Sequence, residues 1–147
     1  MGIKYYSLPL CLNAILDGES PRVKTCNEIE SIDQYIELII TTCPGEHKFN
    51  KNFGCRIWDM DFERVSSRKK WEEDFSSHIK TAIELFEQRI KDVIVSIHVM
   101  EVTKEDHAMN TTAIKKAVSI HVEGQLISSG HSCKFKYKFF LSPLSTE

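Results

Sequence analysis

The sequence lacks the features that mark several large classes of protein. Its five cysteines are odd in number, and no two stand at the C-x-x-C spacing of redox or zinc-binding motifs. We therefore expect reduced, mostly buried thiols and neither a disulfide framework nor a zinc knuckle. Lys and Arg total 19 against 21 Asp and Glu, a net charge of -2. Without a basic excess, the chain is not expected to bind nucleic acid.

Long apolar runs and recognisable catalytic motifs are missing too. No segment approaches the roughly 20 apolar residues that cross a bilayer, and no N-terminal stretch has the pattern of a secretion signal. The sequence therefore predicts a cytoplasmic protein without membrane insertion. It contains no nucleophile elbow, phosphate-cradling glycine loop or HExxH helix. No catalytic residue and no cofactor is predicted.

The composition is that of an ordinary folded domain. Of the 147 residues, 41% are hydrophobic and 27% charged, close to the averages for globular proteins. A globule of this length buries roughly 70% of the surface of its unfolded chain. We expect one domain, residues 1–147. Residues 1–24, which alternate weakly in hydropathy before Pro21 interrupts them, are expected to form an extended N-terminal arm.

The next segment has the period of an amphipathic helix. Thr25 with Glu28, or Ser31 with Gln34, has the spacing of a capping box at its start, and Pro44 follows its end. The apolar stripe consists of Ile29, Ile32, Ile36, Ile39, Ile40 and Cys43.

A second helix follows an aromatic-rich segment, residues 46–63, whose secondary structure the pattern does not decide. Ser66 or Ser67 is placed to cap this helix. Its stripe, which we expect to be buried against a sheet, consists of Trp71, Phe75, Ile79, Ala82, Ile83, Phe86 and Ile90.

The last third of the chain alternates with period two and predicts three strands, at residues 93–99, 118–122 and 135–141. Ser128 to Gly130 suits a hairpin turn, whereas Thr103 to Asn110 reads as a longer polar loop. The expected fold class is α+β, with two main helices packed on a three- to four-stranded, mainly antiparallel sheet.

Histidines on two predicted strands raise the question of a metal site. His98 and His121 have the same phase on strands that we expect to pair, so both imidazoles could share one face. Cys133 is in phase with the apolar side chains and should point to the other face. Because two ligands do not complete a site, we predict histidines that are either hydrogen-bonded within the fold or solvent-facing, and no bound metal.

Two other groups of charged residues could carry function. Glu46 and Glu63 bracket the aromatic-rich segment, and a glycosidase needs only two suitably spaced carboxylates. Among 21 acidic residues, however, this pair does not stand out. Lys134, Lys136 and Lys138 share one face of the last strand. They either face water and protect the strand edge or meet an acidic partner, and a protected edge can also accept a partner strand.

Together, three stretches resemble a family of phage-tail baseplate wedge proteins, often called gene 25-like lysozymes, and its type VI secretion member, TssE. The first, SIDQYIELIITTCPGEHKFNKNFGCRIWDMDFE, spans Ser31 to Glu63; the second is FEQRI, Phe86 to Ile90; the third is the run of strands. His47 replaces the usual Arg of the family's turn. The residues that match family motifs are Gly45 and Glu46 in the turn, Phe53 and Gly54 in the Phe-Gly pair, Phe62 and Glu63 in the ending, and Glu87 and Arg89 in the Glu-Pro-Arg signature.

Gln88 replaces the proline of that signature, which leaves two conformations open. If the chain is extended there, Glu87 and Arg89 point to the same side. If the helix continues, they lie about 200 degrees apart around its axis. From the phase of the helix we expect Glu87 to flank the core without entering it. Both residues should then face a partner, and replacing either with alanine should lower stability by less than about 1 kcal/mol.

The resemblance implies a scaffold role. The family's signature Glu and Arg dock on a bundle formed by the other wedge proteins, TssF and TssG in secretion systems, and the strands join the first ring of sheath subunits. The implied partner-binding residues are therefore Glu87, Arg89, Glu46, Lys134, Lys136 and Lys138. A peptidoglycan-cleaving glycosidase is the alternative, and an adaptor that presents an edge strand to some other protein is a third possibility. The residues do not distinguish a secretion system from a phage tail or a related device.

Overall fold

The computed structural model of this protein describes residues 2–16, 23–60, 67–106 and 111–141. In chain order the elements are β1 (Tyr5–Tyr6), α1 (Asn13–Leu16), β2 (Thr25–Cys26), α2 (Glu28–Thr41), a 3-10 helix (Arg56–Asp59), α3 (Arg68–Phe86), β3 (Ile90–Asp106), β4 (Thr111–Leu126) and β5 (Ser132–Leu141).

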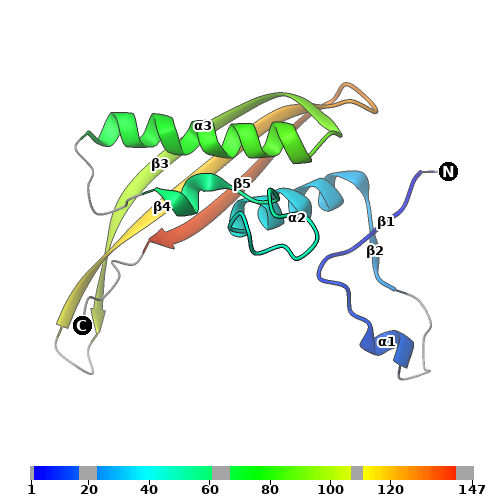
Figure 1. Cartoon of the computed structure of the whole chain (residues 1–147), viewed down its shortest axis with the longest axis horizontal. Helices are drawn as coiled ribbons and strands as arrows, with labels where there is room; N and C mark the ends of the chain where they lie inside the picture. Colours follow the sequence, from blue (N-terminus) through cyan, green and yellow to red (C-terminus); the bar gives the residue numbers. More distant parts are fainter. Residues whose placement is uncertain (1, 17–22, 61–66, 107–110, 142–147) are drawn as a thin grey trace.

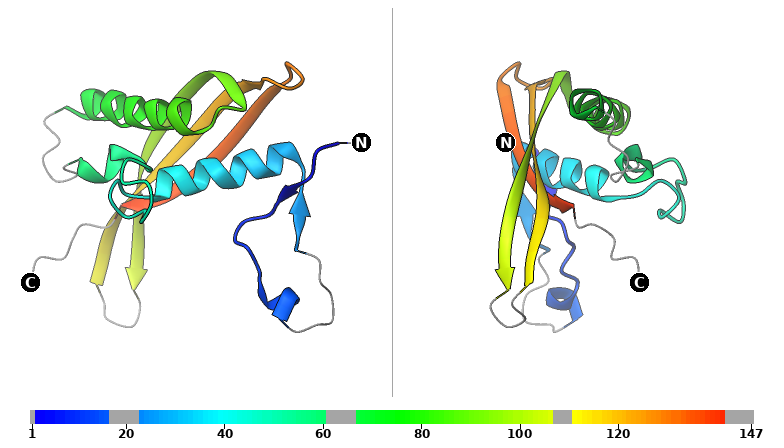
Figure 2. Two further views of the ribbon diagram at one scale, coloured as in Figure 1. Left: turned by 45° about the vertical axis from the view of Figure 1, so that its right-hand side comes forward. Right: turned by 90° about the vertical axis from the view of Figure 1, so that its left-hand side faces the viewer.

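Two layers make up the body of the molecule. Strands β3, β4 and β5 form an antiparallel sheet in that order, and α2 and α3 lie on one of its faces, as Figures 1 and 2 show. The long hairpin of β3 and β4 extends beyond the helices. A separate two-stranded sheet pairs β1 with β2. The prediction of an α+β fold with two main helices on an antiparallel sheet is confirmed.

The core lies between the helices and the covered face of the sheet, and both predicted stripes supply it. Two residues of the predicted α2 stripe differ: Ile29 is 49% exposed, and Cys43 lies beyond the end of the helix and is only partly buried. Ile90, predicted on the second stripe, is the first residue of β3 because α3 ends at Phe86. Trp71 and Phe86, at the two ends of α3, are only partly buried. The fully covered side chains include Ile32, Ile36, Ile39, Ile40, Phe75, Ile79, Ile83, Val118, Ile120 and Val122.

The helix ends are capped by side chains, although not always by the predicted ones. Asn27 begins α2: its side chain accepts from the backbone amide of Glu30, whose carboxylate accepts from the amide of Asn27. Both predicted capping boxes of this helix were therefore wrong. Ser67 caps α3, as expected. At the other end α3 stops at Phe86, because Glu87 has an extended backbone with φ -102° and ψ 94°.

The strands are longer than their alternation indicated. Strand β3 runs to Asp106 and β4 starts at Thr111, so Thr103 to Asp106, predicted as loop, pair in the sheet instead. Residues 107–110 lie outside the described residues. The turn at residues 128–130 is confirmed, and Gly130 there has φ +72°.

The segment between α2 and the 3-10 helix is a tight, internally bonded loop. The amide of Gly45 donates to the carbonyl of Lys51 over 2.8 Å, and the amide of Cys55 donates to that of Thr42 over 2.9 Å. Gly54 has φ +126°, and a Cβ there would clash with the Thr42 carbonyl. The predicted Phe-Gly motif thus has a structural reason, since only glycine fits this close approach.

The N-terminal arm leaves the body of the molecule near the start of α2 (Figures 1 and 2). Its base is the ribbon of β1 and β2, in which Tyr5 pairs with Cys26 and Tyr6 with Thr25. Among the described helices, none is long and apolar enough to cross a membrane.

Candidate functional site

An ion pair occupies the junction between α3 and β3. The Glu87 carboxylate accepts from Nε of Arg89 over 2.8 Å and from Nη2 over 2.6 Å, in the forked geometry that guanidinium and carboxylate groups favour. Its Oε1 also accepts from the backbone amide of Arg89 over 3.0 Å. The helix therefore does not continue through Gln88, and the signature residues face each other, as expected for an extended chain at this position.

The guanidinium is held from two further directions. Its Nη1 donates to Oγ of Ser31 on α2 over 2.9 Å, and its carbon lies 5.1 Å from the centre of the Tyr5 ring. The hydrogen bond to Glu87 raises the pKa of Arg89, and Tyr5 contributes in the same direction. Arg89 is thus fixed by three segments of the chain: the junction itself, α2 and β1.

Burial separates the two signature residues. The Glu87 side chain is 2% exposed, whereas that of Arg89 is 27% exposed. The prediction that Glu87 flanks the core without entering it was wrong. The helical phase used for that prediction does not apply, because the extended backbone at Glu87 turns its side chain inward to meet Arg89 and the start of α2.

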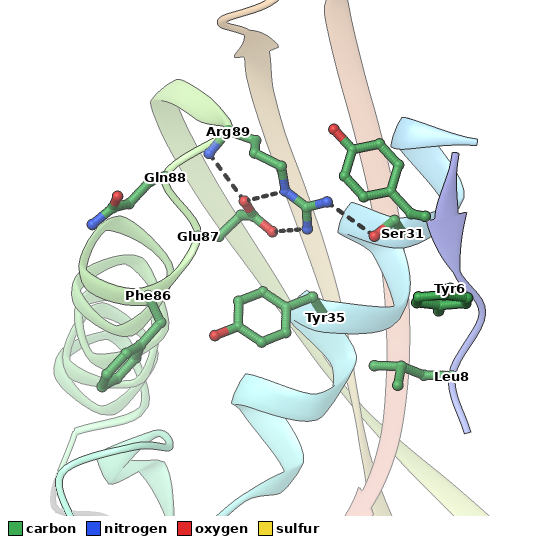
Figure 3. Close-up of a pocket in the computed structure, with 9 residues that line it drawn as sticks. Tyr6, Leu8, Ser31, Tyr35, Phe86, Glu87, Gln88 and Arg89 are labelled. Carbon is green, nitrogen blue, oxygen red and sulfur yellow. Dashed lines mark hydrogen bonds and ion pairs between the residues drawn. The ribbon is translucent and has the colours of Figure 1, made fainter. Parts of the chain in front are cut away.

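A shallow cavity of about 500 Å³ opens beside the ion pair (Figure 3). Tyr6 and Leu8 of the arm face the junction from one side, while Phe86 and Gln88 border the other. Its remaining lining residues are Tyr5, Ser31, Tyr35, Glu87 and Arg89. Aromatic and apolar walls around one organised cation are typical of a recognition site.

The arm is attached to α2 by side-chain hydrogen bonds. Oε1 of Gln34 accepts from the amide of Leu8 over 2.8 Å, and its Nε2 donates to Oγ of Ser7 over 3.2 Å. Ser7 is buried, and its amide donates to the carbonyl of Lys24 over 2.9 Å. One wall of the cavity is therefore tied to the same helix that supplies Ser31.

An aromatic cluster links the junction to the loop that carries the other family motifs. The ring of Phe53 lies 5.0 Å from that of Phe86 and 6.0 Å from that of Tyr35, both of which line the cavity. His47 packs on Phe53 as well, with 5.5 Å between ring centres. Burial, with a contribution from the charge of Glu87, raises the pKa of Tyr35.

Glu46 lies in that loop and is exposed, but its carboxylate already has a local role. Oε2 accepts from the amide of Cys43 over 2.8 Å, and the Glu46 amide donates to the Cys43 carbonyl over 3.1 Å. These bonds stabilise the turn after α2. Glu63, its predicted partner in a carboxylate pair, and the ending residue Phe62 lie outside the described residues.

The three predicted lysines point to the open face of the sheet on β5. Lys134 pairs with Glu123 of β4, with 2.9 Å from Nζ to Oε1, and Nζ of Lys138 lies 5.4 Å from the centre of the Phe140 ring. Lys136 is also exposed and lies opposite His121. Strand β5 pairs only with β4 among the described strands, so it forms one edge of the sheet. The exposed lysines alternate along β5 with the buried Phe135 and Tyr137, so they lie on the face of the sheet opposite the helices.

The two histidines do not face each other directly. His98 lies opposite Ser119, and His121 lies opposite Ser96, so the imidazoles are diagonal neighbours on the open face. Cys133 is buried on the other face, as predicted, and burial raises the pKa of its thiol. Among the described residues, no group of three or more His, Cys, Asp or Glu side chains is arranged to hold a metal ion.

Sequence reasoning missed three residues that build the site. Ser31 and Gln34 were considered only as a capping box, whereas the first binds Arg89 and the second binds the arm. Tyr5 carried no signal. Its contact with Arg89 joins residues 84 positions apart in the chain, and no local pattern reports such a contact.

The arrangement is suited to recognition rather than to proton transfer. Three hydrogen bonds from Arg89 occupy the Glu87 carboxylate. Glu87 and Ser31 take three of the five N–H groups of the guanidinium, and Tyr5 interacts with it as well. The Arg89 side chain is nevertheless 27% exposed and lines the cavity, where an acceptor from another molecule can approach it.

Comparison with known proteins places the chain in a family. A family profile described as "Baseplate wedge protein gp25" matches residues 27–131. Among solved structures, the crystal structure of a candidate tail lysozyme from Geobacter sulfurreducens is 21% identical, with a TM-score of 0.62 over 84% of this chain and 100% of that one, a likeness of fold. A chain of the baseplate complex from the type VI secretion system is 15% identical, with a TM-score of 0.48 over 77% of this chain and 93% of that one. No curated protein matches the chain. Since the profile spans well over half of the sequence, the chain belongs to the family of the baseplate wedge protein gp25.

Proposed function

We propose that this chain is a non-catalytic structural component of the baseplate wedge in a contractile injection machine, similar to TssE of type VI secretion and acting in the cytoplasm. One observation carries the proposal. The signature pair of the wedge family, Glu87 and Arg89, forms an ordered ion pair whose cation remains partly open to a partner. Membership of the family supports the same role.

The first proposed interface joins the chain to other wedge proteins, similar to TssF and TssG. Arg89 is 27% exposed beside a cavity with aromatic walls, and its position is fixed before any partner arrives. Such preorganisation lowers the entropy that docking costs. Glu87 contributes indirectly, because it holds the guanidinium in place and does not itself reach the surface.

The second proposed interface joins the sheet to sheath subunits. Strand β5 forms a sheet edge, and a partner strand could extend the sheet there through main-chain hydrogen bonds. Lys136 and Lys138 would lie next to such a strand and favour an acidic one. This interface is separate from the first, since the exposed lysines alternate with buried residues of β5 and so lie on the face of the sheet that the helices leave open.

What favours a non-catalytic role is the bonding of the candidate carboxylates. Glu87 is engaged by Arg89, and Glu46 caps the turn at Cys43. A glycosidase instead needs one carboxyl that can donate a proton to the leaving group and a second that acts on the sugar. No observation on the described residues favours the glycosidase alternative.

The experiment that tests the proposal is affinity purification of the tagged full-length chain from its source cells in mild salt, with the recovered proteins identified by mass spectrometry. We expect proteins related to baseplate wedge and sheath subunits. Arg89→Ala should lose the wedge proteins, and Lys136→Ala together with Lys138→Ala should lose sheath only. Recovery of neither group, or undiminished recovery of both with all variants, would contradict the proposal.

A further inference from the structure

The guanidinium of Arg89 has a different neighbour on each of its sides. Its Nε and Nη2 edge meets Glu87, and Nη1 meets Oγ of Ser31 over 2.9 Å. The ring of Tyr5, 5.1 Å from the guanidinium carbon, supplies the third contact. Glu87 and Ser31 restrain the group within its plane, whereas an aromatic ring packed against it restrains the tilt of that plane.

Tyr5 is itself held in place by the fold. It pairs with Cys26 in the ribbon of β1 and β2, and β2 is followed directly by the helix cap Asn27. One residue after β1, buried Ser7 accepts from Gln34 and donates its amide to the carbonyl of Lys24. The ring is thus part of a bonded ribbon anchored on α2 and is not a side chain on a loose end.

The same ribbon forms the outer wall of the cavity. Tyr6 is 66% exposed and Leu8 is 37% exposed, and both line the cavity beside the ion pair, as Figure 3 shows. The arm lies outside residues 27–131, which match the family profile.

Building on the proposed function, we propose that Tyr5 is a positioning residue for Arg89 and that the N-terminal arm forms one wall of the wedge-docking site. The acceptors that fit this site are the backbone carbonyls at the C-terminal end of a partner helix. These carry partial negative charge and suit a cation. A partner carboxylate fits less well, because it would approach the Glu87 carboxylate that already accepts from Arg89. An apolar side chain of the same helix end would contact Tyr6 and Leu8.

The test compares four variants of the full-length chain. Tyr5→Ala removes the ring, Tyr5→Phe keeps it without the hydroxyl, and Arg89→Ala removes the cation. Ile3→Ala is the matched control in the arm, since Ile3 is 78% exposed and lies just before β1. Each variant is titrated against the wedge protein that co-purifies with the parent chain. Thermal melts follow the fold in parallel.

A spectroscopic signal reports on Arg89 itself. The Nε–H group of Arg89, bonded to Glu87, gives an NMR cross-peak that can be assigned by its loss in Arg89→Ala. Tyr5→Ala should speed the exchange of this proton with water, because the guanidinium is held less firmly on Glu87, while Tyr5→Phe should keep the parent exchange rate. A shift of the peak position alone is expected from loss of the ring current and does not count as support. Unchanged exchange in a folded Tyr5→Ala variant would show that Tyr5 does not position Arg89.

We expect Tyr5→Ala to weaken wedge binding by about two- to five-fold, as loss of a cation–π contact does, with Tyr5→Phe and Ile3→Ala within two-fold of the parent. If Arg89→Ala abolishes binding but Tyr5→Ala binds like the parent, the inference fails and the proposed function stands. Tighter binding of Tyr5→Ala would make the arm a lid over the site and would also overturn the inference. Normal binding of Arg89→Ala would contradict both the role of Tyr5 and the proposed docking function of Arg89.

Discussion

The ion pair at the α3–β3 junction and the lysine row on β5 are both charged regions predicted to bind partners, yet they are built in opposite ways. The junction buries one charge almost completely and fixes the other through Glu87, Ser31 and Tyr5. The lysines are exposed: Lys134 forms a surface ion pair with Glu123, and Lys138 contacts the ring of Phe140. Stability and recognition should therefore be coupled at the junction and separable on β5.

The scale for this comparison is set by a core residue that has no part in either surface. Phe75 on α3 is 1% exposed and stacks on Trp71, with 4.8 Å between ring centres. Phe75→Ala should lower the free energy of unfolding by about 3–5 kcal/mol, because it leaves an aromatic-sized cavity in the core. Chemical denaturation measures this change. A melt within a degree or two of the parent would mean that the α3 stripe does not carry the fold.

At the junction we expect the next largest effect, and an unequal one. Arg89→Ala leaves the buried Glu87 carboxylate with the backbone amide of residue 89 as its remaining donor at this junction and should cost about 2–3 kcal/mol, the penalty of a buried acceptor that loses its partner. Glu87→Ala leaves a guanidinium that is already partly in water, and should cost about 1–2 kcal/mol. These values replace the expectation of less than about 1 kcal/mol each, which assumed that both side chains lie at the surface.

A double-mutant cycle on Glu87 and Arg89 checks this asymmetry. The double variant removes both charges and should be less destabilised than the sum of the two single variants, because no buried charge remains unpaired. Glu87→Gln serves as the matched control that keeps the size of the side chain. If Glu87→Ala proves the more costly single change, then burial of the carboxylate is not what couples this site to the fold.

The sequence predicted the layers of this fold because periodicity reports burial directly. Most of the predicted α2 and α3 stripes and the inward residues of the strands lie in the core, and Ser67, one of the two predicted caps, begins α3. The prediction erred at the ends of elements, where a few local hydrogen bonds determine which residue begins or ends a helix or strand. Asn27 rather than Thr25 or Ser31 caps α2, and β3 continues to Asp106 through polar residues whose partners lie on β4.

At the site, the identity of the signature residues was predictable, but their orientation and their neighbours were not. Family motifs identified Glu87 and Arg89, but the orientation of Glu87 depends on where α3 stops, which is a property of a single residue's backbone. Because the helical phase was extended by one residue beyond Phe86, the Glu87 carboxylate was predicted at the surface, whereas it is buried. Ser31, Gln34 and Tyr5 come from other segments, and their roles follow from packing between elements that no pattern along the chain encodes.

Glu46 offers an intermediate case: an exposed acid with a bonded carboxylate. Glu46→Ala should cost about 1 kcal/mol, since it removes one charge-assisted hydrogen bond to the Cys43 amide. Purified chain should show no muramidase activity on peptidoglycan, so neither this variant nor Glu63→Gln should have activity to lose. Turnover that disappears in either variant, with the fold intact by circular dichroism, would establish the glycosidase alternative and displace the structural role.

The smallest effect on stability, and the clearest separation from function, is expected on β5. Lys136→Ala and Lys138→Ala should each change the free energy of unfolding by less than about 0.5 kcal/mol, because exposed side chains without buried partners contribute little. Together they should weaken sheath recovery and reduce its dependence on salt, since screened charge attraction is what they would add. Lys134→Ala is the matched control: Glu123 already neutralises Lys134, so its loss should matter less to an acidic partner. Equal loss of sheath with Lys134→Ala would show that the strand itself, and not the charge of Lys136 and Lys138, makes the interface. A large loss of stability in any of the three variants would show that stability and recognition are coupled on β5 as they are at the junction.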